Sequence, residues 1–531
     1  MKHYSDGKDL HRLMLDGVNI LADNVASTYG PKGRNVILRK KDGKPIITKD
    51  GVTVARFVSL EDPFQDAAVE IVKQASEKTN SDAGDGTTTS TILARAIFAK
   101  SLELIERGLS PVEVKRGLDK VCDLVCEKVE EKSRPISSVE DVAFVAKISA
   151  NNDQVIGDLI STAVDKVGKG GSVTIEDGRS TETTLDLVEG FRFQSGFLSN
   201  YFVTDERRNV CRYDNALIFL CDAQVDQVQT ILPVLEIAAR EQKPVVLVCD
   251  DVEGQALSAL VMNSARGSMK VAAVKSPKYG EERRATMQDL AIATGAKYFR
   301  TMMGDQVKDV TINDLGTCHN IEISKYGTII VGGGGDTDEL SQRIEDLKQQ
   351  VKDAESLVDA EQVQERVTRL SSGVAIVRVG AATEIEMIEK KHRIEDALEA
   401  VRSAQQEGIV PGGGLTLYRI SQTILDDIRN IELTEDQKFA AEIFYDVLRS
   451  PMKTMAENAG YDFEDIDSKL SNESDDTGFN FLLGIPADMY REGIIDPAKV
   501  TKNALRNAVS AAGTLLTTNF AIIEESGKTP N

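Results

Sequence analysis

Hydrophobic residues recur at helical spacing through most of the first 134 residues and again from residue 408 to the end. This periodicity predicts amphipathic helices, the clearest of them over residues 10–26, 64–78, 88–106, 112–132 and 503–523. Two short apolar runs, 35–38 and 45–48, are joined by a connection that contains Asp42-Gly43, which favours a β-hairpin. Both ends of the chain are therefore expected to be mainly helical.

The middle of the chain, residues 190–373, has a different pattern. Short apolar runs are each followed by a helical pattern, in the order 244–249, 252–265, 271–274 and 281–294. Strands that alternate with helices in this way are typical of an α/β unit with parallel strands. Apolar positions three and four apart between 338 and 370 predict two long antiparallel helices.

The composition is that of a folded, acidic protein with several domains. The 531 residues include 63 lysines and arginines against 85 aspartates and glutamates, a formal charge of −22. At roughly 150 residues per domain, this length predicts about three or four domains. The negative charge argues against nucleic acid and anionic membranes as partners, because both are negative themselves. Aromatic residues make up only 5% and Trp is absent, so base-stacking platforms are not expected.

The sequence carries no signal for export. The first six residues lack the apolar segment of a signal peptide, and no apolar run approaches the roughly 18 residues that span a bilayer. The six cysteines form no Cys-x-x-Cys pair and are interpreted as buried reduced thiols, with a metal or redox site at Cys122 and Cys126 as the less favoured alternative. The four histidines match no zinc spacing. These features predict a soluble, cytoplasmic protein.

Most familiar enzymatic motifs are absent. The sequence has no Gly-x-x-x-x-Gly-Lys-Ser/Thr phosphate loop, no Gly-x-Gly-x-x-Gly, no Gly-x-Ser-x-Gly and no His-Glu-x-x-His. Their absence argues against P-loop NTPases, Rossmann dehydrogenases, α/β-hydrolases and zinc proteases. Candidate chemistry must therefore come from less specific patterns.

The strongest such pattern is Gly-Asp-Gly-Thr-Thr-Thr at residues 84–89, directly ahead of a predicted helix. Glycines let backbone N–H groups approach an anion, and a helix N-terminus attracts negative charge. An aspartate beside phosphates is a natural Mg²⁺ ligand. Taken alone, the pattern is more often a plain turn followed by a helix cap.

Four other segments give weaker signals. Residues 29–33 and 411–414 are glycine-containing turns. Residues 48–51 place a carboxylate at the end of a predicted strand, and residues 393–398 place paired acids in a predicted helix. Each also has a plain explanation as a turn, a linker or a solvated helix face.

Together, and in this order, these segments closely resemble the bacterial-type (group I) chaperonins of the GroEL class. The likeness extends over nearly the whole chain and is carried by residues 30–36, 48–52, 83–89, 251–254, 271–275, 379–384, 412–414 and 495–501. So many matches in order are not a coincidence.

The resemblance implies a multi-domain α+β chaperonin fold that spacing alone does not show. It implies a mainly helical equatorial ATP-binding domain at residues 1–134 and 408–531. A small intermediate hinge domain is expected at 135–189 and 374–407. An α/β apical substrate-binding domain is expected to be inserted at 190–373. By the same resemblance, hinges are expected at Pro135, Gly190, Gly373 and Gly408. Glycine tolerates the large φ/ψ changes that a hinge requires.

Carried over position by position, the resemblance implies a site for ATP with Mg²⁺ and K⁺. Asp85 matches the Mg²⁺ ligand, and Asp50 and Asp396 match catalytic carboxylates that orient the attacking water. The positions near a K⁺ ion are Thr28, Lys49 and Thr88. The nucleotide contacts are expected at Gly30, Pro31, Lys49, Asp85, Gly86, Thr87, Thr88, Thr89, Gly413, Asn480, Ile494 and Asp496. Phosphoryl transfer needs mainly positioning and charge neutralisation, so no covalent nucleophile is required.

The apical segment would supply the second function. The positions that match the polypeptide-binding residues of these chaperonins are Phe197, Tyr201, Phe202, Leu232, Leu235, Leu257, Val261 and Met262. The residues alone favour core packing, because apolar groups at helical spacing are usually buried. An apolar groove at a ring mouth would instead hold non-native chains, which expose apolar surface of their own.

The resemblance thus implies an ATP-dependent chaperonin that captures non-native polypeptides and folds them in a ring cavity. The expected partners are non-native polypeptides, further copies in a seven-membered ring, a second ring, and a co-chaperonin lid. The alternatives are a structural ring assembly with weak or lost ATPase activity and an ATP-dependent small-molecule enzyme. Intact Asp50, Asp85 and Asp396 argue against the first, and no reactive substrate pocket supports the second.

The sequence also departs from the chaperonin pattern. Residues 525–531 lack a Gly-Gly-Met-rich tail, and Phe481-Leu482 replaces the usual paired small residues after Asn480. Pro411 stands where a small residue is usual, and Ser372 interrupts a glycine pair. The chain is therefore expected to be a diverged member, with ring number, co-chaperonin dependence and nucleotide affinity left open.

Overall fold

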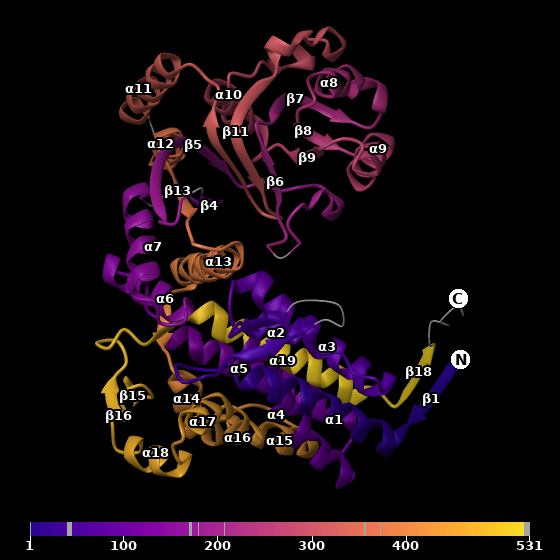
Figure 1. Ribbon diagram of the computed structural model, residues 1–531, viewed down its shortest axis with the longest axis vertical. Coiled ribbons are helices and arrows are strands. Elements are labelled where there is room, and N and C mark those ends of the chain that lie inside the picture. The colour runs from indigo at the N-terminus through magenta and orange to yellow at the C-terminus, as the bar shows by residue number, and fades with distance from the viewer. Residues whose placement is uncertain are drawn as a thin grey trace. The chain divides into compact units, whose positions relative to one another are not determined.

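The computed structural model describes residues 2–39, 45–168, 172–178, 180–206, 208–354, 357–371 and 373–524. It divides into two compact units (Figure 1). Unit 1 comprises Met1–Ser161 and His392–Asn531, and unit 2 comprises Thr162–Lys391. Both boundaries fall inside the segments assigned to an intermediate domain, so the three-domain division stays a prediction. The connection at 41–44, Ser372 and the tail at 525–531 lie outside the described residues.

Unit 1 is mainly helical, as the periodicity predicts. Its helices are α1 (Gly7–Ala26), α2 (Gly51–Phe57), α3 (Pro63–Ala83), α4 (Thr87–Glu106), α5 (Pro111–Lys132), α6 (Val139–Ser149), α14 (Leu415–Ile428), α15 (Glu435–Glu442), α16 (Phe444–Val447), α17 (Ser450–Ala459), α18 (Phe463–Leu470) and α19 (Ala498–Thr517). Helices α7 (Gln154–Val167) and α13 (Glu384–Glu407) contribute residues to both units. The apolar faces of α1, α3, α4, α5 and α19 form one core.

The prediction of one helix over residues 503–523 is wrong at its C-terminal end. Helix α19 stops at Thr517, and β18 (Phe520–Glu524) pairs antiparallel with β1 (Lys2–Asp6). Along β18, Phe520 and Ile522 are exposed, whereas Ala521 and Ile523 pack against the core. This alternation has the period of two that a half-buried strand requires, and the helical pattern stops where it begins.

Three further pairs of short strands are found among the described residues of unit 1. The predicted hairpin is confirmed by β2 (Val36–Leu38), which pairs antiparallel with β3 (Ile46–Thr48). The other pairs are β14 (Ile409–Pro411) with β17 (Ile495–Pro497) and β15 (Thr477–Asn480) with β16 (Ile485–Asp488). Pro411 therefore lies in a strand, opposite Ile495, directly before the glycine triplet.

Unit 2 is built on a mixed sheet of ten strands in the described residues. Its main order is β4 (Ser172–Asp177), β13 (Gly373–Val379), β5 (Thr184–Phe193), β12 (Thr328–Gly333), β11 (Gly316–Ile323), β7 (Leu217–Val225), β8 (Val245–Val252) and β9 (Val271–Lys275), with β10 (Tyr298–Phe299) beside β7 and β6 (Cys211–Asp214) beside β11. Strands β7, β8, β9 and β10 run parallel, which confirms the predicted α/β unit.

The helices of unit 2 are α8 (Val228–Glu241), α9 (Gly254–Ala265), α10 (Gly280–Thr294), α11 (Thr337–Asp353) and α12 (Leu357–Ser371). Helices α11 and α12 pack against each other, as the spacing between 338 and 370 predicts. Asp289 of α10 is buried and ion-pairs with both Arg343 of α11 and Arg366 of α12, at 2.9 and 2.7 Å. One buried carboxylate thus fastens the helix pair to the rest of the unit.

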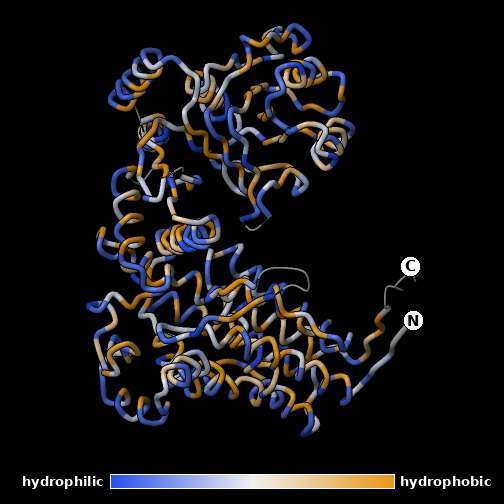
Figure 2. The backbone as a smooth tube through the Cα atoms, viewed as in Figure 1, coloured by the Kyte–Doolittle hydropathy of each residue, from blue (hydrophilic) through white to orange (hydrophobic). Residues whose placement is uncertain are grey.

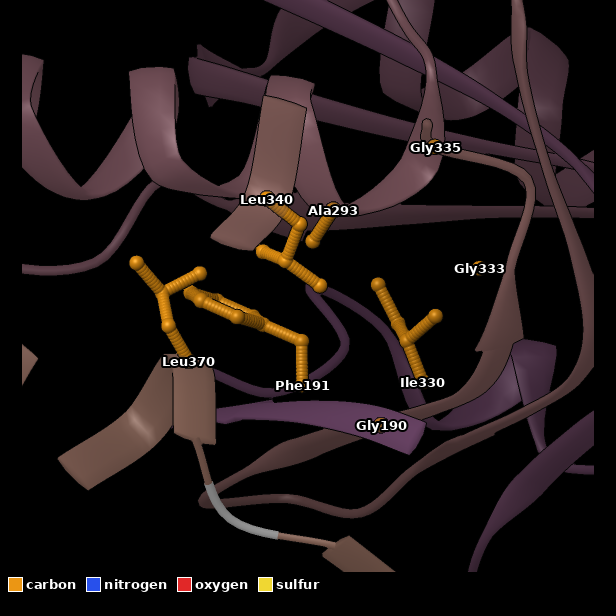
Figure 3. Close-up of a pocket in the computed structure, with 8 residues that line it drawn as sticks. All are labelled: Gly190, Phe191, Ala293, Ile330, Gly333, Gly335, Leu340 and Leu370. Carbon is orange, nitrogen blue, oxygen red and sulfur yellow. The ribbon is translucent and has the colours of Figure 1, made fainter. Parts of the chain in front are cut away.

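The structure does not support the conformational reason given for two of the expected hinge glycines. Gly190 and Gly373 both lie inside paired strands, and neither has a positive φ. A Cβ at Gly190 would collide with Val374, so this glycine is needed for close packing. Gly190 also borders a small pocket, into which the apolar side chains of Phe191, Ile330, Leu340 and Leu370 point in Figure 3. Gly408, by contrast, has a φ of 81°.

The six cysteines are buried and free, in agreement with their interpretation as reduced thiols. Hydrophilic and hydrophobic positions are mixed along the helices in Figure 2. Among the described residues, no helix is long and apolar enough to cross a membrane.

Candidate functional site

The Gly-Asp-Gly-Thr-Thr-Thr segment forms the junction between α3 and α4 in unit 1. Gly84 caps the C-terminus of α3 with a φ of 77°, and Gly86 precedes α4 with a φ of 96°. A Cβ at Gly86 would approach Val500 to 2.9 Å, so space and φ both require glycine. No side chain caps α4, and its first N–H groups are left available.

The first residue of α4 points to an anion as the missing partner. Thr87 is only 4% exposed, and its hydroxyl Oγ1 has no hydrogen-bond partner. A buried polar atom without a partner is costly and therefore uncommon. The uncapped helix end and the unused hydroxyl together fit the phosphates of a nucleotide.

Asp85 lies between the two glycines, beside this helix end. Its carboxylate accepts hydrogen bonds from the backbone of Gly86 and from Ser149 Oγ at 3.2 Å. Desolvation raises the pKa of Asp85, and the charge of Asp50 raises it further. Within the described ranges, no cluster of three or more metal-ligating side chains is found. A single carboxylate such as Asp85 fits Mg²⁺ beside phosphates, because Mg²⁺ is usually bound there by one or two carboxylates together with phosphate oxygens.

The Lys49-Asp50-Gly51 turn lies against the same helix end. Asp50 caps α2 and accepts hydrogen bonds from the backbone of Val52 and Thr53 and from the Thr53 hydroxyl. A Cβ at Gly51 would collide with the Thr88 hydroxyl, so the turn needs glycine to approach α4. Desolvation lowers the pKa of Lys49. Asp50 is thus held in place by its capping role, with one lone pair of Oδ1 still unused.

Helix α13 reaches the junction from the other side. Ser403 donates a hydrogen bond to the carbonyl of Ala83 at 2.7 Å, and a Cβ at Gly84 would collide with Glu399. Asp396 lies three residues before Glu399 and seven before Ser403, so all three share one face of α13. This face of α13 contacts the junction through Glu399 and Ser403, on the two turns that follow Asp396.

The positions expected to hold the adenosine also converge in unit 1. A Cβ at Gly413 would lie 2.9 Å from Met489 and 3.7 Å from Ile494, and a Cβ at Gly412 would lie 2.9 Å from Asp496 Oδ1. Gly30, with a φ of 80° and followed by Pro31, has no room for a Cβ beside Met455. At these three positions a side chain would collide with neighbouring residues, so the close packing of these segments requires glycine.

Asn480 lies at the end of β15, where its side chain makes local hydrogen bonds. It is buried, and its Oδ1 accepts hydrogen bonds from the backbone of Leu482 and Leu483, while its Nδ2 donates to Glu492. The Oδ1 atom thus shapes the β15–β16 turn, and the Nδ2 atom ties this turn to Glu492. Phe481 is buried against Phe479, with ring centroids 5.2 Å apart, which explains why an aromatic residue is accommodated here.

Asp496 is expected to make the free energy of unfolding depend on pH. Desolvation, with a smaller contribution from the charge of Asp85, raises the pKa of Asp496 to about 7. Between about pH 4 and pH 7 the folded chain holds a proton that the unfolded chain releases, so the free energy of unfolding falls as pH rises through this range. We expect Asp496→Asn to reduce this fall. The check is the urea midpoint at pH 5 and pH 8 without nucleotide; an unchanged difference would contradict the assignment.

The family model of the TCP-1/cpn60 chaperonins matches residues 21–526 of the chain. The chain belongs to the TCP-1/cpn60 chaperonin family. The mixed helical and sheet fold with an inserted unit is thus the chaperonin fold that the resemblance implied.

Solved structures agree on the fold. The chain is similar to the chaperonin gp146 from the bacteriophage EL 2 (Pseudomonas aeruginosa), crystallised in the presence of ATP-BeFx, at 22% identity. In two crystal forms of that protein the TM-scores are 0.70 and 0.62, and the match covers 98% of this chain and 99% of the other.

Within this chaperonin, the positions expected to bind polypeptides fall into two groups. Phe197, Phe202 and Leu235 are buried in the core of unit 2, which corrects the expectation that they line an open surface. The core-packing explanation holds for these three because their side chains fill the space between the sheet and its helices. Tyr201, Leu232 and Met262 are 69%, 44% and 49% exposed, and Leu257 and Val261 are partly buried on α9.

Two residues of the site, Ser149 and Glu399, escaped the sequence reasoning, and Tyr29 was named there only as part of the turn at 29–33. Ser149 binds Asp85, Glu399 packs on Gly84, and Tyr29 bonds to Thr89. Ser149 and Glu399 show no signal in the sequence, because their roles depend on helices that meet only in the fold. Tyr29 is adjacent to Gly30-Pro31, and a polar aromatic residue beside a glycine turn was a usable signal.

Proposed function

We propose that the chain is an ATP-dependent chaperonin, which binds and hydrolyses ATP and uses the cycle to capture and release non-native polypeptides. The observation that carries the proposal is the convergence, in unit 1, of the uncapped α4 N-terminus, Asp85 and the Asp396 face of α13. The experiment is the rate of phosphate release from ATP with Mg²⁺, with and without an unfolded polypeptide. No release above the buffer rate would overturn the proposal.

In this mechanism the α4 N-terminus binds the phosphates. The N–H groups of Thr87, Thr88 and Thr89 and the unpartnered Thr87 hydroxyl donate to phosphate oxygens. Mg²⁺, when bound, neutralises charge on the phosphates, and Asp85 would hold it. Lys49 lies in the turn that packs on Thr88.

In the proposal, Asp50, which caps α2, and Asp396, in α13, both face this helix end. In the proposal their carboxylates accept hydrogen bonds from the attacking water and aim its oxygen at the terminal phosphate. Since α13 begins in unit 2 and ends in unit 1, the position of Asp396 would link hydrolysis to movement of the substrate-binding part.

The K⁺ ion stays a proposal that follows from the resemblance. Thr28 donates its hydroxyl to the carbonyl of Val25 and still has oxygen lone pairs available. The Thr88 hydroxyl faces Gly51. Lys49 has only its backbone carbonyl to offer a cation, because its ammonium group is positive itself.

The apolar groups exposed on α8, α9 and the 200–202 turn support polypeptide capture. The 200–202 turn packs on α9, and α9 packs on α8, so the side chains of Tyr201, Leu232 and Met262 lie on neighbouring elements. A non-native chain would bury its own apolar side chains against them.

We expect the double change Leu232→Ser and Met262→Ser to weaken capture of a denatured polypeptide at least about fivefold. Both side chains are about half exposed, so their loss removes apolar contact area without opening a core cavity. The measurement is binding of a chemically denatured, fluorescent client without nucleotide. Tyr326→Ser, which removes an exposed aromatic group elsewhere in unit 2, is the matched control. Equal binding by both variants would contradict the role of this surface.

Two strand pairs of unit 1 support assembly into a ring. The β2–β3 pair exposes Ile37, Ile46 and Ile47, and the β1–β18 pair exposes Phe520 and Ile522. Exposed apolar side chains on two-stranded ribbons with unpaired edges are typical contact points between copies. We propose that these ribbons join neighbouring copies in a ring of seven, to which a second ring and a co-chaperonin lid would be added.

A further inference from the structure

Tyr29 occupies a fixed place at the candidate nucleotide site, directly before Gly30-Pro31. Asn458 of α17 donates one hydrogen bond to the carbonyl of Tyr29, at 3.0 Å, and another to the carbonyl of Ala26, at 2.7 Å. The Tyr29 ring packs against the apolar cluster that contains Met455. Both the backbone and the ring are therefore held by residues outside α1.

The phenol of Tyr29 bridges two parts of the site that are 60 residues apart. Its hydroxyl lies 2.9 Å from the hydroxyl of Thr89, the third residue of α4. Burial, with the charges of Asp496 and Asp85, raises the pKa of Tyr29. The phenol therefore stays neutral and keeps its proton, which it can donate.

We propose that Tyr29 is a positioning residue, which orients the Thr89 hydroxyl so that its proton points at a bound phosphate. A hydroxyl has one proton and two lone pairs. When Thr89 accepts the proton of Tyr29, its own proton is directed elsewhere, towards the anion at the α4 N-terminus. The inference rests on the proposed function, because it needs a phosphate in this place.

A purely structural Tyr29 would behave differently. If it only held the turn at 29–33, its loss would lower stability and would act independently of the Thr89 hydroxyl. If it acts through Thr89, removing the phenol matters only while that hydroxyl is present. The two cases are separated by a double-mutant cycle.

The test compares Tyr29→Phe, Thr89→Val and the double variant in full-length protein. Tyr29→Phe keeps the ring and removes one hydrogen bond, so we expect KM for ATP to rise about five- to tenfold. Thr89→Val is expected to raise KM by at least as much, and adding Tyr29→Phe to it should change KM less than twofold. Tyr418→Phe, which removes a buried phenol bonded to Asp467, is the matched control and should lower Tm with KM unchanged.

Two results would overturn the inference. A Tyr29→Phe variant with KM within twofold of wild type would show that the phenol does not matter. Losses that multiply in the double variant would show that Tyr29 acts other than through Thr89. A wild-type chain that neither binds nor hydrolyses ATP would overturn the proposed function itself, and this is seen before any variant is made.

Discussion

Replacing Asp396 by alanine is expected to lower kcat for ATP hydrolysis by about 100-fold or more and to leave ATP affinity within about twofold. General-base positioning of a nucleophile contributes about 10²- to 10⁴-fold. The phosphate-binding groups, by contrast, lie on α4 and are untouched by the change. Binding and hydrolysis should therefore separate in this variant.

The measurement is single-turnover phosphate release, with nucleotide affinity determined separately by equilibrium binding. Asp123→Ala removes an exposed carboxylate from α5 in the same unit and should behave like the wild type. Near-normal turnover by Asp396→Ala would contradict its role and would leave Asp50 to orient the water alone. Loss of ATP affinity would instead assign Asp396 to nucleotide binding.

Replacing Asp85 by asparagine is expected to abolish the Mg²⁺ dependence of hydrolysis and to reduce kcat/KM by at least about 100-fold. Asparagine keeps the size of the side chain but removes the negative charge that Mg²⁺ requires, and metal-assisted charge neutralisation is worth several kcal/mol. Because desolvation raises the pKa of Asp85, Mg²⁺ affinity of the wild type should also weaken as pH falls, since a metal ligand must be deprotonated.

The check for Asp85 is the hydrolysis rate as a function of Mg²⁺ concentration. Asp82→Asn, three residues earlier and exposed on α3, is the matched control and should keep the wild-type Mg²⁺ response. A normal Mg²⁺ response in Asp85→Asn would show that another group holds the ion.

The helical periodicity was enough to place most helices of unit 1, and the short apolar runs between helical patterns were enough to place the parallel strands of unit 2. It failed at Phe520–Glu524, because five residues of alternating pattern follow a long helical one and their partner strand, Lys2–Asp6, is more than 500 residues away. Pairing over such a separation leaves no local signal. The insertion of unit 2 into unit 1 likewise came from the resemblance and not from spacing.

The candidate site was predictable where a glycine pattern marks it and unpredictable where helices meet. Gly84, Gly86 and Gly413 have positive φ, a conformation that favours glycine, so these turns leave a visible mark in the sequence. Ser149 and Glu399 reach the same place from α6 and α13, and nothing in their local sequence indicates it. A match to a family position also does not show whether a side chain is exposed. Leu235 matches a polypeptide-binding position of the chaperonins, yet its side chain lies in the core.

The most direct test of the account is the refolding yield of a chemically denatured client enzyme incubated with the full-length protein, with and without Mg²⁺-ATP. A proposed co-chaperonin lid can be supplied in a parallel arm. The account predicts that the protein alone holds the client inactive and soluble, that ATP raises the yield of active enzyme several-fold, and that Asp396→Ala fails to do so. A yield that is the same with ATP, without ATP and without the protein, in both arms, would contradict it.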